Sequence, residues 1–126
     1  MAMEKIEFKR IGKVQAIDKF RPDFLPLQIT LDGSPNGLWI KCFKNPKTFR
    51  GNEVLGIEVK DNIITFREHE SQVKETLGWI ENYISQANTV YKAQVAEYQA
   101  RQKREKEQEQ AKKAELDRIN ESLKDL

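Results

Sequence analysis

The chain has 126 residues, enough for one domain or for a small domain with an appendage. Hydrophobic residues make up 38% and charged residues 33%, with a mean hydropathy of -0.75, so we expect part of the chain to lie outside any core. The net charge of +2 alone argues against a nucleic-acid partner, but residues 1–50 carry ten basic and five acidic side chains, whereas residues 71–126 carry ten of each. The basic excess therefore belongs to the N-terminal part, where a binding face could use it.

The chain shows no sign of an oxidising compartment or of a membrane. Cys42 is the single cysteine, which excludes an internal disulfide framework and fits a reducing compartment. The first residues contain no apolar run of signal-peptide length, and no segment approaches the ~20 apolar residues of a membrane span. We expect a cytoplasmic protein without membrane contact, or one made in the cytosol by a resident virus or plasmid.

The first 70 residues alternate between apolar and polar side chains with a period of two, which is typical of β-strands. The alternation predicts a first strand over residues 6–16, with a bulge or bend at Gly12. A loop is expected over residues 18–26, and a turn at residues 32–37 (DGSPNG) closes a hairpin. Further strands are expected over residues 25–31, 38–43, 54–60 and 63–67, the last two joined by the turn Asp61-Asn62.

Five short antiparallel strands, the first bent at a glycine, make a small barrel or rolled sheet. Their order resembles the OB-fold: IEFKRIGKVQAI as the long bent strand, then LQITLDG and LWIKCF, then FRGNEV leading into the IEV strand. The resemblance spans roughly residues 4–68, and SH3-like barrels share much of the pattern. One departure is that residues 44–53 are too short and Pro/Gly-containing for the helix often found between the third and fourth strands. The bottom of such a barrel would need the C-terminal helix to cover it.

From Ser71, which is expected as an N-cap, the apolar period becomes helical, and no proline follows. Large apolar residues recur as far as Tyr98, are missing from residues 99–113, and return at the end of the chain. The sequence therefore predicts an OB-like β-barrel over residues 1–70, a helix packing on it over 71–98, and an extended charged helix over 99–126. The last segment is expected to form a coiled coil or a helical hairpin, or else to be solvated and partly disordered.

The sequence offers no pattern of catalytic or metal-binding residues. His69, the single histidine, lies between Glu68 and Glu70 and is predicted to be a surface residue, and Cys42 is predicted to be a buried small residue. A P-loop, a dinucleotide-binding fingerprint, a nucleophile elbow and Cys/His metal spacings are all missing from the sequence. We therefore expect no enzyme and no cofactor or metal.

Aromatic and basic residues mix in the third expected strand and its flanking loops. Single-stranded nucleic acid is held by aromatic rings that stack on bases and by Lys and Arg that follow the phosphates. The OB resemblance implies the second and third strands and the first loop as the ligand surface. The candidate contacts are Trp39, Lys41, Phe43, Lys44, Lys47, Arg50, Lys9, Lys13, Phe20 and Arg21. The competing interpretation places Trp39 and Phe43 in the core, because so small a domain needs most of its large residues there.

The helix beyond residue 90 is expected to be out of reach of the barrel, so it must pair with another chain, bind a partner or fray. The candidate self-association residues are Tyr91, Val95, Tyr98, Leu116, Ile119 and Leu123. The sequence thus favours a non-catalytic single-stranded DNA- or RNA-binding protein whose helix self-associates or recruits a replication or repair partner. The alternatives are a protein–protein adaptor, inhibitor or assembly factor that multimerises through the helix, and a virion or scaffold component.

Overall fold

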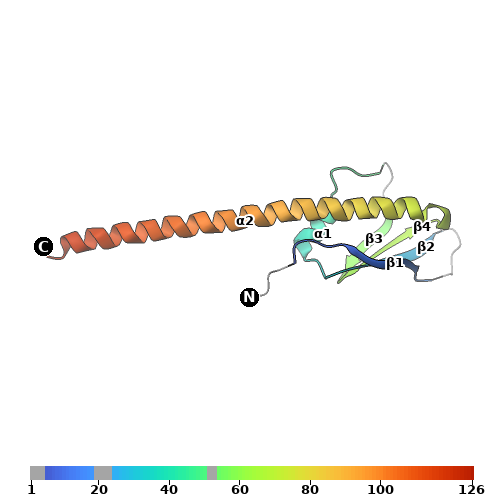
Figure 1. The fold of residues 1–126 in the computed structure, drawn as a ribbon, viewed down its shortest axis with the longest axis horizontal. Helices are drawn as coiled ribbons and strands as arrows, with labels where there is room; N and C mark the ends of the chain where they lie inside the picture. Colours follow the sequence, from blue (N-terminus) through green and yellow to red (C-terminus); the bar gives the residue numbers. More distant parts are fainter. Residues whose placement is uncertain (1–4, 19–23, 51–53) are drawn as a thin grey trace. The chain divides into compact units, whose positions relative to one another are not determined.

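The computed structural model describes residues 5–18, 24–50 and 54–126. Four strands, β1 (Arg10–Ala16), β2 (Leu25–Leu31), β3 (Leu55–Lys60) and β4 (Ile63–Glu68), are accompanied by helix α1 (Gly37–Lys44) between β2 and β3. A short 3-10 helix (Glu70–Gln72) leads into α2 (Val73–Leu123), a helix of 51 residues (Figure 1). The chain divides into two units: unit 1 ends at Lys92, and unit 2 is Ala93–Leu126.

The strands of unit 1 form one antiparallel sheet in the order β1-β2-β4-β3. Alternate residues of β2 and β4 are buried, and Leu27 pairs with Phe66 while Ile29 pairs with Ile64. α1 and the first part of α2 lie on this face of the sheet (Figure 1). The core of unit 1 is therefore a single layer between one face of the sheet and two helices.

Both edge strands of the sheet carry an irregularity at a glycine with positive φ. In β1 the register shifts between Ile11 and Gln15, around Gly12 at φ 71°, and in β3 it shifts between Leu55 and Glu58, around Gly56 at φ 61°. The expected bend at Gly12 is thus confirmed. Such bulges interrupt the ladder of free backbone groups that would otherwise favour edge-to-edge pairing with another sheet.

The expected strand over residues 38–43 is wrong, because these residues form α1. Asn36 is the N-cap: its side-chain oxygen accepts a hydrogen bond from the Trp39 backbone N–H at 3.0 Å. Trp39 and Phe43, four residues apart, then point to one side of the helix and are buried. The segment DGSPNG consequently leads into a helix and closes no hairpin.

The sheet has four strands where five were expected, and the paired strands leave β1 and β3 as its two edges. Without the third expected strand and without pairing between β1 and β3 in the described residues, nothing in the sheet identifies an OB-fold. The strands at residues 25–31, 54–60 and 63–67 agree with β2, β3 and β4 to within one residue at each end. Asp61, at φ 55°, begins the tight turn expected between β3 and β4.

The helical stripe expected after residue 71 is confirmed in unit 1. Ile80, Ile84, Ala87 and Tyr91 are all buried, together with Tyr83. The expected N-cap is wrong, since Ser71 lies inside the 3-10 helix and α2 begins two residues later. In unit 2, the helix continues through Leu123, and every side chain except the half-buried Val95 is exposed.

Candidate functional site

Two amide side chains on α2 form hydrogen bonds with the backbone of segments outside the sheet. Asn88 makes the same pair of hydrogen bonds with Phe8 that a neighbouring strand would make: its Oδ1 accepts from the Phe8 N–H at 2.9 Å, and its Nδ2 donates to the Phe8 carbonyl at 2.7 Å. The same Oδ1 accepts from the Trp39 indole at 2.9 Å. Gln86 likewise bonds the backbone of Lys47 and Thr48. These amides fix the segments before β1 and after α1, and nothing in the sequence pattern singles them out.

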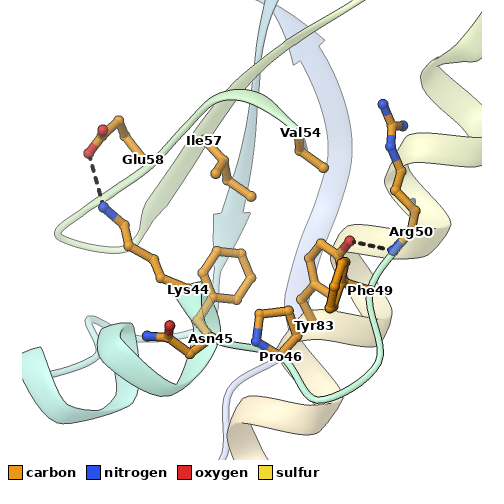
Figure 2. A pocket seen from close by; sticks show the side chains of 10 residues that line it. Lys44, Asn45, Pro46, Phe49, Arg50, Val54, Ile57, Glu58 and Tyr83 are labelled. Atoms are coloured by element: carbon orange, nitrogen blue, oxygen red, sulfur yellow. Dashed lines mark hydrogen bonds and ion pairs between the residues drawn. The ribbon is translucent and has the colours of Figure 1, made fainter. Parts of the chain in front are cut away.

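A pocket of about 740 Å³ opens between the end of α1, the segment that follows it and β3 (Figure 2). At its rim, Lys44 Nζ lies 3.5 Å from a carboxylate oxygen of Glu58, and the Tyr83 hydroxyl accepts a hydrogen bond from the Arg50 N–H at 3.1 Å. Because these polar groups bond to one another, the apolar lining is what the pocket offers to a ligand. The residues around it are Phe43, Lys44, Asn45, Pro46, Phe49, Arg50, Val54, Ile57, Glu58 and Tyr83.

Beside this pocket, a buried carboxylate is held by three donors. Glu68 is 5% exposed and accepts hydrogen bonds from the Thr76 hydroxyl at 2.6 Å and the Arg50 guanidinium at 3.3 Å, as well as from the His69 backbone N–H. Burial raises the pKa of Glu68, but the bonds from Thr76, His69 and Arg50 outweigh it and hold the pKa below its ordinary value. The carboxylate is therefore ionised and fully bonded, an arrangement that stabilises the fold.

The described residues bring together no group of His, Cys, Asp and Glu that could hold a metal ion. His69 is exposed, and its ring packs edge-on against Phe24. Cys42 is half-buried, and burial raises the pKa of its thiol, which keeps it in the less reactive protonated form. Within the same residues, no helix is long and apolar enough to span a membrane.

Two of the three aromatic residues of the expected nucleic-acid surface, Trp39 and Phe43, are wrong as contacts. Trp39 and Phe43 are 0% and 2% exposed and stack on each other with ring centroids 5.4 Å apart, so neither ring can stack on a base. Helix formation is the physical reason, since it turns both residues toward the sheet. Arg50 bonds Glu68 and Thr76, and Lys44 is paired with Glu58. Phe20 and Arg21 lie outside the described residues.

Four of the expected basic contacts remain exposed. Lys9, Lys13, Lys41 and Lys47 carry exposed side chains, and none of them forms an ion pair with another residue that the structure describes. Two basic residues near β1 are paired with acids, Lys5 with Asp32 and Arg10 with Glu81. Among the residues that the structure describes, the expected surface therefore keeps positive charge and loses its two aromatic rings.

The expected self-association residues fall into two groups. Tyr91 is buried in unit 1, where its hydroxyl accepts a hydrogen bond from Asn36 Nδ2 at 2.7 Å, so assigning it to an interface between chains is wrong. Val95 is half-buried, whereas Tyr98, Leu116, Ile119 and Leu123 are exposed. We call these exposed residues of unit 2, together with Val95 and with Leu126 just beyond the end of α2, the α2 stripe.

Comparisons of the chain with protein-family models, with curated protein sequences and with solved structures each found no match. The candidate site therefore rests on the geometry of this chain alone.

Proposed function

We propose that this chain is a non-catalytic assembly protein, in which residues 93–126 of α2 bind a second helix and thereby join copies of the chain. The observation that carries the proposal is the exposure of the α2 stripe. Leu116, Ile119 and Leu123 are 52%, 37% and 50% exposed, on a helix whose unit contains no other element to cover them. Large apolar residues grouped on one helix face, with charged residues around them, are typical of a helix that pairs with another.

The energetics favour a partner for this segment. A helix that packs against nothing is only marginally stable in water, and ion pairs such as Glu97–Arg101 add only about 0.3–0.5 kcal/mol each. Burying a Leu or Ile side chain completely contributes about 1.5–3 kcal/mol. Pairing two copies therefore stabilises the helix far more than its own surface charges do.

Sedimentation of the full chain tests the proposal, with Leu116→Glu compared against Ala114→Glu. Both variants add one carboxylate to unit 2, but Ala114 lies on the side of the helix away from the stripe. Since each copy loses about 1.5–3 kcal/mol of apolar burial, we expect Leu116→Glu to weaken the dimer about 100-fold or more. The Ala114→Glu variant should associate like the wild type. A wild-type chain that stays monomeric at high concentration would contradict the proposal.

Single-stranded nucleic-acid binding is the second candidate, and the four unpaired lysines are the observation that favours it. With Trp39 and Phe43 buried, these two rings contribute no stacking, and the attraction that the four lysines supply is electrostatic. If all four lysines met phosphates, the logarithm of the binding constant would fall with the logarithm of salt concentration with a slope of about -3.

Fluorescence anisotropy with labelled oligo-dT and a matched duplex, at low and high salt, tests this candidate. We expect binding to the single strand at low salt to be weakened by Lys41→Ala/Lys47→Ala, whereas Lys103→Ala/Lys106→Ala in unit 2 serves as the control of equal charge change. Binding that does not depend on salt concentration, or no binding at low salt, would contradict nucleic-acid binding through these lysines. Neither result would affect the assembly proposal.

A further inference from the structure

The large apolar residues at the two ends of residues 95–126 fall on one common seven-residue spacing. One set of positions, labelled a, holds Val95, Gln102, Glu109, Leu116 and Leu123. The other set, labelled d, holds Tyr98, Glu105, Lys112 and Ile119, and Leu126 continues its spacing three residues beyond the end of α2. The two apolar ends of the segment therefore occupy the same two positions of the repeat, although a charged stretch separates them. A repeat of seven drifts by ~20° per heptad on a straight helix, and a left-handed supercoil with a second helix removes this drift.

We propose that these a and d residues pair with the same residues of a second copy running in the opposite direction, with Val95 facing Leu126 and Tyr98 facing Leu123. This inference rests on the proposed function and adds the partner, the direction and the alignment. In the same alignment Gln102 faces Ile119, Glu105 faces Leu116, and Glu109 faces Lys112. Val95 and Tyr98 thus meet apolar residues of the other copy, whereas Leu116 and Ile119 meet the longer polar side chains of Glu105 and Gln102.

The charges in the middle of the segment select the antiparallel direction. In a parallel pair in register, each a or d residue faces its own copy, so Glu105 would face Glu105, Glu109 would face Glu109, and Lys112 would face Lys112. Like charges held together at a seam are destabilising. In the antiparallel pair, Glu109 faces Lys112 twice, once from each copy, and Lys112 and Lys113 of the second copy lie within about one helical turn of Glu105.

The charges also select one antiparallel alignment over its neighbours. Sliding one helix by a heptad in one direction places Glu105 opposite Glu109. Sliding it by a heptad in the other direction places Leu123 opposite Glu105 and Ile119 opposite Glu109. Both shifts remove the two Glu109–Lys112 pairs. The first also brings like charges together, and the second leaves no apolar residue opposite another. The complementary sequence lies within residues 95–126 themselves, which identifies the partner as a second copy of this chain.

Disulfide cross-linking of the full chain, in a Cys42→Ser background, tests the direction and the alignment. A Tyr98→Cys chain mixed with a Leu123→Cys chain should give a cross-linked heterodimer under mild oxidation, because antiparallel pairing brings these two positions opposite each other. Leu123→Cys alone should give no cross-link, since its two copies lie far apart in the antiparallel pair. Cross-linking of Leu123→Cys with itself, or a dimer that forms neither cross-link, overturns the inference while the assembly proposal stands. A monomer in sedimentation overturns both.

A charge exchange gives a second, independent readout. Glu109→Lys alone and Lys112→Glu alone should each raise the dimer dissociation constant about 10-fold or more, because each creates two like-charged contacts per dimer. The double variant Glu109→Lys/Lys112→Glu should restore the wild-type value, since it exchanges the charges and keeps the pairs opposite. In a parallel dimer in register, positions 109 and 112 each face their own copy, so like charges face each other in the wild type and in every variant. Single variants that leave the dissociation constant unchanged therefore contradict the antiparallel alignment.

Discussion

The two halves of α2 carry apolar stripes of different widths: the first half packs against the sheet of unit 1, and the second half is exposed, where we propose that a second helix binds. In unit 1 the buried positions include adjacent residues, such as Tyr83 and Ile84, and cover a broad face of the helix. In unit 2 the large apolar residues keep strictly to the a and d positions, which form a narrow seam. A broad stripe suits the flat surface of a sheet, whereas a narrow one suits a second helix.

This contrast explains how one uninterrupted helix can serve two purposes. The first half supplies the core of unit 1 and the amide side chains of Asn88 and Gln86 that fix two loops. The second half exposes its apolar residues and surrounds them with charges of both signs, eight basic and eight acidic over residues 93–126. A helix that only covered the sheet of unit 1 would need neither the α2 stripe nor its seven-residue spacing.

The largest expected effect comes from breaking unit 1 at its centre. Trp39→Ala removes the fully buried indole, its packing against Phe8 and Phe43, and its hydrogen bond to Asn88. We expect the free energy of unfolding to fall by about 3–5 kcal/mol, as for other buried aromatic residues. Urea denaturation, monitored by the fluorescence of the remaining tryptophan Trp79, measures this change. At denaturant concentrations where unit 1 is folded, the dimer dissociation constant of Trp39→Ala should stay near the wild-type value. A large change in this constant would mean that the folding of unit 1 and the association through unit 2 depend on each other.

A smaller effect is expected at the buried carboxylate. Glu68→Gln weakens the bonds with Thr76 and Arg50, so we expect the free energy of unfolding to fall by about 1–3 kcal/mol at neutral pH. Because the folded pKa of Glu68 lies below its unfolded value, its stabilising contribution is complete above the unfolded pKa and is lost as pH falls through the folded one. The wild type should therefore lose more stability than Glu68→Gln between neutral and acidic pH. Parallel losses in the two proteins would show that another carboxylate dominates.

The long helix was predictable because its apolar period repeats many times. The stripe through Ile80, Ile84, Ala87 and Tyr91 is a signal that chance rarely produces. The same regularity led to the wrong assignment of Tyr91 to an interface between chains, because a continuous apolar stripe does not show where the helix leaves the core of unit 1. The exposed residues from Tyr98 to Leu123 were predictable for the opposite reason: a charged stretch separates them from any core.

The segment from Leu38 to Phe43 shows where sequence patterns fail. Six residues of alternating character fit a strand with a period of two, and they also fit a helix that buries Trp39 and Phe43 four residues apart. The deciding residue was Asn36, which caps the helix, but an Asn beside Pro and Gly is equally typical of a hairpin turn. The hydrogen bonds of Asn88 to Phe8 join residues 80 positions apart, and no local pattern encodes such a contact.

Hydrogen–deuterium exchange of α2 in the wild type and in Leu116→Glu tests the central claim most directly, because it reads the two halves of one helix separately. We predict that residues 73–92 are protected in both proteins, since unit 1 covers them. We predict that residues 93–126 are protected in the wild type at concentrations above the dimer dissociation constant and lose that protection in Leu116→Glu. Equal protection of residues 93–126 in the two proteins, or rapid exchange of these residues in the concentrated wild type, would contradict the account.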